Sequence, residues 1–313
     1  MSPEIKIFAT SNSKDLATKI ADELGVELGV LRTEKFSDGE VFVEFQESIR
    51  GRTLFIIAQV NMPYDNLFEL FLAVDAARRA SVREIICVMP YLPHSRQERK
   101  DSNRTSIASR VVADFIQQVG ADRVVTVDLH TNSIEGFFKI PVDHLDMTQV
   151  FSKHIKNLNL DELCLCSPDF GGLKRIKKYK KLLECEMAVI HKERLVPNQV
   201  ASMEIIGEVA GKNVVIIDDM IDTAGTLCKA AELIMEKGAK SVTAYCTHGL
   251  LSGKATERIE NSPLTKVYVA DTLNNGVQSP SIEYLTCSHM IASGIKNLTS
   301  NKSIKDMNEK FDI

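Results

Sequence analysis

The chain has 313 residues, of which 44% are hydrophobic and 26% are charged, and its net charge is −4. This composition excludes extensive disorder, because apolar residues are plentiful and the net charge per residue is small. It also excludes a surface that is basic throughout, as in a general nucleic-acid binder, so any site for an anion must be a local concentration of cations. At about 100–200 residues per domain, the length predicts two domains.

Strand-like apolar runs alternate with amphipathic stretches along almost the whole chain. The predicted strands are residues 5–9, 53–58, 84–89, 123–128, 162–166, 187–191, 213–218, 241–247 and 266–270. Helical spacing of apolar residues occurs in 15–24, 66–80, 107–119, 147–156, 173–183 and 226–237. The alternation predicts an α/β fold with mainly parallel sheets flanked by helices.

An internal duplication is visible in the sequence. Residues 51–58 (Gly-Arg-Thr-Leu-Phe-Ile-Ile-Ala) match residues 211–218 (Gly-Lys-Asn-Val-Val-Ile-Ile-Asp), and a loop, a helix and a strand follow each copy. The match predicts two related domains, 1–146 and 147–313. Only the second copy continues into a loop rich in carboxylates, so we expect the second domain to hold the substrate chemistry.

The cellular compartment is indicated by three features. No apolar run approaches the roughly 18 residues that a membrane span needs. The first residues enter a strand pattern without a secretion signal. Seven cysteines lie mostly in apolar stretches without a CxxC motif, which indicates buried, reduced thiols. We therefore expect a cytoplasmic protein.

Three carboxylates follow the most apolar predicted strand, and a turn of small residues then opens a helix. In chain order, the residues of this segment that can contact a ligand are Asp218, Asp219, Asp222, Thr223, Ala224, Gly225 and Thr226. Parallel sheets bind ligands at the carboxyl ends of their strands, and a helix N-terminus favours an anion. Carboxylates would repel an anion unless they bind hydroxyl groups or a divalent cation, so the combination predicts a phosphorylated sugar with a metal ion. A structural alternative is that the acidic residues only cap the helix.

Two segments concentrate positive charge. Residues 94–104 are polar and lack apolar periodicity, which is typical both of a loop that closes over an active site and of an ordinary surface loop. Residues 174–181 carry six basic side chains in eight. A solvated helix face is the favoured interpretation of this second segment, ahead of nucleic-acid binding.

The acidic segment resembles the phosphoribosyl-pyrophosphate motif of the type I phosphoribosyltransferase fold. Four further segments, in the same order and spacing, make the chain similar to the ribose-phosphate pyrophosphokinase (diphosphokinase) family from residue 4 to about residue 300. They are residues 36–40, Arg96-Gln97 with Lys100-Asp101, residues 128–130, and residues 167–172 followed by 191–194. The resemblance implies two tandem phosphoribosyltransferase-type (type I) domains, each with a mainly parallel sheet flanked by helices.

The resemblance also implies an activity. The enzyme would transfer the β,γ-pyrophosphoryl group of ATP to the C1 hydroxyl of ribose 5-phosphate, giving 5-phosphoribosyl 1-pyrophosphate and AMP for nucleotide biosynthesis. Ribose 5-phosphate is then expected at Arg194 and at the acidic segment from Asp218 to Thr226. ATP is expected at Phe36, Asp38, Gly39, Glu40, Arg96, Gln97, Lys100 and Asp101. Without the family, residues 36–40 indicate only a tight turn between strands.

Metal and catalytic residues follow from the same resemblance. It implies that His130 and Asp169 bind magnesium, with up to two ions per site, although a lone histidine is usually structural. Magnesium keeps several waters and takes one or two protein carboxylates, so a histidine contact through water is expected. Lys192 and Arg194 follow a predicted strand and would stabilise the charge of the transition state.

Two other functions share part of this pattern. A non-catalytic, synthetase-associated regulatory subunit would be expected to lack metal or transition-state residues, which are present here. A phosphoribosyltransferase would share the acidic motif but would not need a duplicated domain or the ATP segments. In the family a neighbouring subunit completes the ATP site, so we expect a homo-oligomer, a hexamer, without a nucleic-acid or membrane partner.

Overall fold

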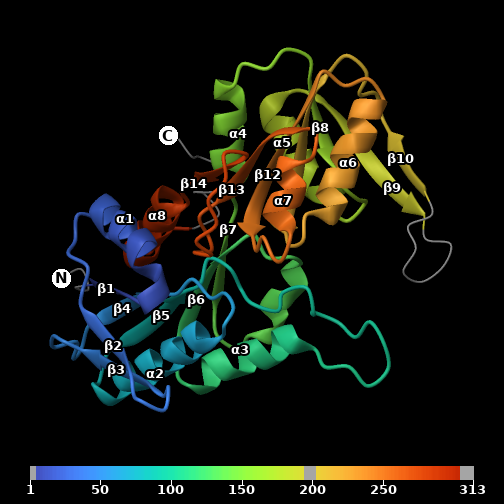
Figure 1. Ribbon diagram of the computed structural model, residues 1–313. Helices are drawn as coiled ribbons and strands as arrows, with labels where there is room; N and C mark the ends of the chain where they lie inside the picture. Colours follow the sequence, from blue (N-terminus) through green and yellow to red (C-terminus); the bar gives the residue numbers. More distant parts are fainter. Residues whose placement is uncertain (1–4, 194–201, 304–313) are drawn as a thin grey trace. The chain divides into compact units, whose positions relative to one another are not determined.

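The computed structural model describes residues 5–193 and 202–303 (Figure 1). These residues form two compact units. The first contains residues 5–146, 272–274 and 286–303, and the second contains the described part of 147–271 together with 275–285. The two units differ from the predicted domains in that residues 272–274 and 286–303 belong to the first unit. The division into domains 1–146 and 147–313 stays a prediction.

The first unit is built on a five-stranded parallel sheet with the order β1-β4-β5-β6-β7. Its strands are β1 (Ile5–Ala9), β4 (Thr53–Ile57), β5 (Glu84–Val88), β6 (Arg123–Val127) and β7 (Val142–Leu145). A separate antiparallel hairpin consists of β2 (Leu31–Lys35) and β3 (Val41–Phe45). All five residues of β4 are buried, as expected for a central strand with helices on both faces.

Helices cover both faces of this sheet. They are α1 (Lys14–Leu24), α2 (Asp65–Arg79), α3 (Ala108–Gln118) and α8 (Ser288–Thr299), with short 3-10 helices η1 (Ser11–Ser13) and η2 (Asn132–Phe137). In Figure 1, α1 and α8 lie on one side of the strands and α2 and α3 on the other. Leu70, Val74 and Ala77 follow helical spacing along α2 and join the same buried cluster as Leu54 and Ile56 of β4.

The second unit is built on a seven-stranded sheet with the order β10-β9-β8-β11-β12-β13-β14, in which only β10 is antiparallel to its neighbour. Its strands are β8 (Leu163–Ser167), β9 (Glu186–Glu193), β10 (Ser202–Ile206), β11 (Asn213–Ile221), β12 (Ser241–Gly249), β13 (Leu264–Ala270) and β14 (Ile282–Leu285). Strand β11 is central and its run 214–217 is buried on both faces, which explains its continuous apolar sequence.

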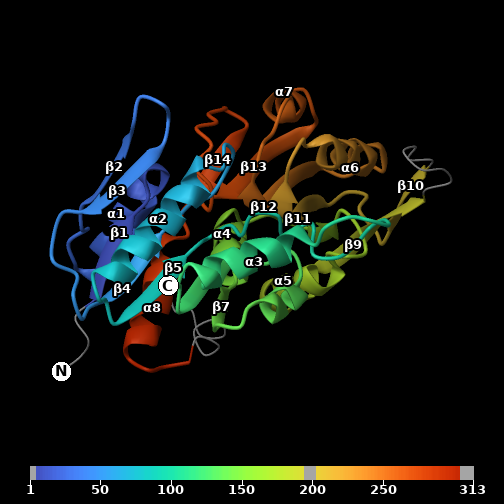
Figure 2. The same cartoon turned by 90° about the horizontal axis from the view of Figure 1, so that it is seen from below.

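Two pairs of helices cover the second sheet, as Figures 1 and 2 show. They are α4 (Thr148–Asn157) with α5 (Leu173–Leu183), and α6 (Gly225–Glu236) with α7 (Ala255–Glu260). Cys164 and Cys166 of β8 both belong to the cluster formed with α6 and α7, as expected for residues two apart, which share one face of a strand. On the opposite face, Phe151 of α4 packs edge-on against Tyr245 of β12 with ring centroids 5.4 Å apart.

The duplication extends to individual hydrogen bonds. Gly51 and Gly211 both adopt left-handed backbones, with φ of +71° and +70°. The N–H of Gly51 donates to the Ser81 carbonyl at 2.9 Å, and that of Gly211 donates to the Gly238 carbonyl at 2.8 Å. A residue with a side chain is disfavoured at such a φ, so both glycines are needed for the turn that enters the central strand.

Two helices each pack in a different unit from the strand that precedes them in the chain. Helix α4 follows β7 in the chain but packs beside α5 in the second unit, whereas α8 follows β14 but packs beside α1 in the first. Gly294 of α8 lies so close to Leu145 of β7 that an added Cβ would approach a Leu145 methyl to 3.3 Å. We call this arrangement the exchange of α4 and α8, since each helix joins the unit to which its preceding strand does not belong.

The predicted fold class, two mainly parallel sheets flanked by helices, is confirmed. Every predicted strand and helix is present, with ends that differ by a few residues. The elements that the sequence patterns missed are β2, β3, β7, β10, β14, α7 and α8. All seven cysteines are free and all but Cys185 are buried, as predicted. Within residues 5–193 and 202–303, no helix is long and apolar enough to cross a membrane.

Candidate active site

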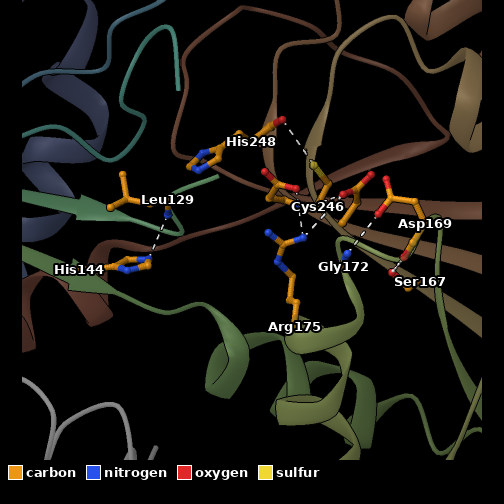
Figure 3. Close-up of polar contacts among 10 residues, drawn as sticks. Leu129, His144, Ser167, Asp169, Gly172, Arg175, Cys246 and His248 are labelled. Carbon is orange, nitrogen blue, oxygen red and sulfur yellow. Dashed lines mark hydrogen bonds and ion pairs between the residues drawn. The ribbon is translucent and has the colours of Figure 1, made fainter. Parts of the chain in front are cut away.

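Two adjacent carboxylates mark the carboxyl end of β11. The side chain of Asp219 is 8% exposed, and that of Asp218 is 29% exposed. Nη1 of Arg175 lies 3.0 Å from Oδ1 of Asp219 and 3.7 Å from Oδ1 of Asp218. Figure 3 shows Arg175 rising from α5 toward the strand end that carries Cys246, on the same side as Asp169 and Gly172. Arg175 therefore contacts both carboxylates and lies closer to that of Asp219.

The electrostatics of this pair favour a proton on Asp218. Burial raises the pKa of the Asp218 carboxyl well above its ordinary value of 3.8, and the charge of Asp219 raises it further, while Arg175 opposes both effects. The ionised carboxylate of Asp219 accepts hydrogen bonds, and a protonated carboxyl at Asp218 both accepts them and donates one. Neighbouring hydroxyl groups of a sugar match such a pair of acceptors.

The loop after β11 is built to receive an anion. Ala224 ends the loop in a left-handed conformation with φ of +59°, and α6 starts at the next residue. Among the described residues, no side chain caps this helix end, and the first N–H groups of a helix have no partner within the helix. Both features direct backbone donors toward the space above the loop, where a phosphate is favoured.

Gly225 opens this space further. Its φ is not positive, and an added Cβ would meet only ordinary contacts, at 3.8 Å from Nη1 of Arg258 and 4.0 Å from Oγ1 of Thr223. Neither the backbone angle nor the packing thus requires glycine at this position. A glycine here is explained if a ligand approaches the backbone too closely for a side chain to fit. Arg258 of α7 holds the loop in place, because its Nη1 donates to the Thr223 carbonyl at 2.7 Å. Thr223 and Thr226 are exposed, and Asp222 is half-buried.

Asp169 follows β8, the neighbour of β11. Its Oδ1 accepts from the Gly172 N–H at 3.1 Å, and its carbonyl accepts from the Ser167 hydroxyl at 2.7 Å. These bonds fix the orientation of an exposed carboxylate beside the acidic pair, and its charge adds to the rise in the pKa of Asp218. The structure therefore brings Asp169 together with residues 218–226 at one edge of the sheet of the second unit.

His130 belongs to the first unit, three residues after the end of β6, and is exposed. The N–H of the preceding residue, Leu129, donates to Nε2 of His144 at 3.0 Å (Figure 3). Nδ1 of His144 lies 3.4 Å from Oε1 of Glu135, so the ring carries its proton on Nδ1. His144 thus has a structural role, since it supports the backbone beside His130.

Residues 36–40 form the turn of the β2–β3 hairpin. The Phe36 N–H donates to the Glu40 carbonyl at 2.8 Å, and the Gly39 N–H donates to the Phe36 carbonyl at 2.9 Å. Gly39 has a φ of +93°, and Asp38 accepts from the Glu40 N–H at 3.0 Å. The structural alternative, a tight turn between strands, is therefore confirmed. The turn also leaves the Phe36 ring 58% exposed, which is available area for stacking.

The loop at 94–104 is fixed at its base and exposed along its length. Ser109, which is fully buried, donates through its hydroxyl to the His94 carbonyl at 2.6 Å, and the His94 ring lies 5.2 Å from the ring of Tyr64. The four residues of this loop that are predicted to contact ATP are all exposed: Arg96, Gln97, Lys100 and Asp101. They belong to the first unit.

The predicted catalytic residues are only partly covered by the structure. The backbone of Lys192 lies in β9, where it pairs with Met203 of β10, and Arg194 falls outside the described residues. Among the residues that are described, no three histidine, cysteine or carboxylate side chains converge on a preformed metal cluster. Asp169 nevertheless fits magnesium, which takes one or two protein carboxylates and keeps its waters.

Arg175 is the site residue that sequence reasoning missed. It stands in the basic run 174–181, which was interpreted as a solvated face, and that interpretation fits the exposed Lys174, Lys177 and Lys181. Arg175 instead has only 20% of its side chain exposed. The available signal was its spacing of four from Tyr179, which is fully buried, because residues four apart share one helix face.

Comparison with known proteins gives consistent matches along the chain. The N-terminal domain of ribose phosphate pyrophosphokinase matches residues 5–120, and the phosphoribosyl synthetase-associated domain matches residues 184–308. The ribose-phosphate pyrophosphokinase of Porphyromonas gingivalis is 42% identical over 299 residues, which cover 95% of this chain and 96% of the relative. That of Chlorobaculum tepidum is 44% identical over 306 residues, covering 97% and 95%. The crystal structure of phosphoribosylpyrophosphate synthetase from Mycobacterium smegmatis has a TM-score of 0.89 at 34% identity and covers 95% of this chain and 99% of that one.

Proposed function

Since the chain belongs to the ribose-phosphate pyrophosphokinase family, we propose that it joins ATP and ribose 5-phosphate. The β,γ-pyrophosphoryl group moves to the C1 hydroxyl, giving 5-phosphoribosyl 1-pyrophosphate and AMP. The observation that carries this proposal is the edge of the second sheet, where paired carboxylates stand beside an uncapped helix N-terminus. The pair accepts from sugar hydroxyls while the helix end receives a phosphate, and few other ligands offer both groups.

Ribose 5-phosphate is oriented by the two parts of this edge. Asp218 and Asp219 accept from the ribose hydroxyls, and Arg175 holds the two carboxylates in place. The loop from Asp222 to Thr226, together with Arg194, binds the 5-phosphate. Fixing both ends of the sugar sets the position of the C1 hydroxyl for attack in line with the leaving AMP.

The nucleotide side of the reaction is assigned to the first unit. Adenine stacks on Phe36, and Asp38 and Glu40 accept from its amino group, with Gly39 making the turn. Arg96, Gln97, Lys100 and Asp101 contact the rest of ATP. Lys192 and Arg194 neutralise the charge that spreads over the oxygens of the transferred group.

We propose magnesium as the cofactor, held by Asp169 and His130 with up to two ions per site. Asp169 presents an oriented, exposed carboxylate, as a hard cation requires. When bound, magnesium supplies charge neutralisation at the phosphate oxygens and polarises the phosphorus that is attacked.

The assembly is proposed to be a homo-oligomer, specifically a hexamer, and the compartment the cytoplasm. Three large apolar side chains remain exposed on α2 and α3: Phe68 at 57%, Val111 at 44% and Phe115 at 55%. Exposed apolar side chains on adjacent helices favour a protein partner, here another copy of the chain. The buried free thiols suit a reducing compartment.

A coupled assay for AMP, with ATP, ribose 5-phosphate and magnesium, tests the proposal. We expect AMP to form only when all three are present. Transfer of a phosphoribosyl group to a base would instead indicate a phosphoribosyltransferase. No AMP from the chain alone, but altered activity of an active synthetase mixed with it, would indicate a regulatory subunit.

A further inference from the structure

The β2–β3 hairpin is held to its unit differently from the matching hairpin in the second half. In the second half, β9 pairs with β8 over four successive residues before the chain turns into β10. In the first half, the chain makes a single bridge to β1, between Leu28 and Ile7, and then leaves the sheet. The turn at residues 36–40 therefore depends on side-chain contacts for its position.

Val43 and Phe45 of β3 supply apolar contacts with the cluster that includes α2, and one face of β2 adds polar ones. Leu31, Thr33 and Lys35 alternate along the strand, so they share one side. Leu31 is buried in the cluster that includes α2, and Lys35 pairs with Asp65 of α2 at 2.5 Å in an exposed ion pair. Exposed pairs fix a geometry weakly. The hydrogen bond of Thr33, in the middle of the strand, is directional. It therefore restrains the position of β2 more closely than this ion pair does.

Thr33 is bonded to a buried carboxylate on α2. Its hydroxyl donates to Oε1 of Glu69 at 2.7 Å, and Glu69 is only 3% exposed. The same carboxylate accepts from the Ser11 N–H and from the Ser11 hydroxyl, each at 2.7 Å. An ionised carboxylate only accepts hydrogen bonds, and bonds to a charged acceptor are short and strong. Glu69 thus joins the hairpin, the turn after β1 and α2 at one buried point.

We infer that Glu69 is a positioning residue for ATP, acting through Thr33 on the turn that presents Phe36. Thr33 precedes Phe36 by three residues in the same strand and turn, so losing its bond lets the turn move relative to α2. The inference rests on the proposed function, because it takes residues 36–40 as the adenine-binding turn. In the second half, Lys229 occupies the equivalent position on α6 and is exposed, so this contact is particular to the nucleotide hairpin.

The substitution Thr33→Val tests this, since it removes the hydroxyl and keeps the β-branched shape. We expect the KM for ATP to rise about fivefold, the worth of one hydrogen bond, with kcat and the KM for ribose 5-phosphate unchanged. Thr33→Ser should restore the wild-type KM. Thr18→Val is the matched control, because the hydroxyl of Thr18 donates within α1, to the Lys14 carbonyl at 2.8 Å, and no bond from it to another element occurs among the described residues. An unchanged KM for ATP, or an equal change in all three constants, would overturn the inference.

A double-mutant cycle with Glu69→Met, which keeps the length of the side chain but has no oxygen to accept from Thr33, tests whether the effect passes through Glu69. The added Thr33→Val should then raise the KM for ATP no further, and full additivity would contradict the proposed route. Hydrogen exchange at the Phe36 and Gly39 amides gives a second readout that does not need activity. Faster exchange in Thr33→Val supports the inference and unchanged exchange contradicts it, whereas absence of AMP formation by the wild-type chain counts against the proposed function alone.

Discussion

The edges that follow β4 and β11 share a backbone design and differ in chemistry. Both strands are entered through a left-handed glycine and are followed by a loop and a helix, with residues 58–64 forming the loop after β4 and residues 222–224 the loop after β11. Where the second half has Asp218 and Asp219, the first has Ala58 and Gln59. Hydrogen bonds of three asparagine side chains close the first edge: Asn12 Nδ2 donates to Asn61 Oδ1 at 2.6 Å, Asn61 donates to the Asn274 carbonyl, and Asn274 donates to the Asn12 carbonyl. The duplicated framework thus has the same turns in both halves, and of these two edges the second is the one open to a ligand.

Other equivalent strand ends also differ in the polar residue that they carry, and the difference does not always favour the second half. The backbone N–H of Asp128 donates to Leu145, and that of Asp271 donates to Leu285, each at 3.0 Å, so the ends of β6 and β13 correspond. Two residues further on, the first half has His130 and the second has the buried Leu273. By the same reasoning Asp169 corresponds to Ser11. Each half has therefore kept a different polar residue at a strand end, which fits one composite function better than two separate ones.

The two hairpins offer the largest contrast between the halves. Lys192→Ala, in the second hairpin, should lower kcat by about 10²–10³-fold with nearly unchanged ATP binding, because a cation at the transferring group acts in the transition state. Phe36→Ala, in the first, should raise the KM for ATP and spare kcat. Steady-state kinetics with a direct ATP-binding measurement check both. An unchanged kcat in Lys192→Ala would remove that residue from catalysis.

A smaller effect is expected from equivalent substitutions at the two strand ends. Asp219→Ala leaves Arg175 without its closest partner and removes one acceptor for the sugar, so kcat/KM for ribose 5-phosphate should fall about a hundredfold. The matched substitution Gln59→Ala should change the melting temperature but not kcat/KM. Equal losses of kcat/KM from the two would show that the first edge also serves the reaction.

The smallest effect concerns pH. Because the folded-state pKa of Asp218 is raised, the folded chain binds a proton above pH 3.8 that the unfolded chain has lost, and stability falls as pH rises through that window. Asp218→Asn should remove this decline, so the variant gains stability over the wild type as pH increases. Hydrogen exchange gives the opening free energy of the β11 amides as a function of pH in the wild type and in the variant. The β4 amides serve as the control, because Ala58 stands at the place that matches Asp218, and their opening free energies should not differ between the two proteins. Parallel pH profiles at β11 would contradict the expectation.

The sequence was sufficient where the fold depends on local pattern. Buried strands such as β4 and β11 are continuous apolar runs, and α2 and α6 have regular apolar spacing, so all were predictable. Strand β2 was missed because its sequence, Leu-Arg-Thr-Glu-Lys, is mostly charged and becomes a strand only through pairing with β3. Strand β14 has four residues and depends on β13 beside it. Such long-range pairing is not encoded in a short window.

The candidate site divides in the same way. Residues 218–226 were predictable because they are contiguous, and the structure places Asp169 beside them as parallel neighbouring strands require. Arg175 was hidden by the basic residues around it, and its role depends on which face of α5 meets β11. Glu69 and Thr33 are separated by 36 residues, and nothing in either neighbourhood signals their contact.

The exchange of α4 and α8 has a consequence for how the chain is made. A ribosome releases the strands and hairpin of the first unit early, but the helix that packs beside α1 ends only at Thr299. The first unit therefore cannot complete its outer layer until nearly all of the polypeptide has been translated. A fragment that stops at residue 146 would carry α1 without its partner helix and the first sheet with part of one face uncovered.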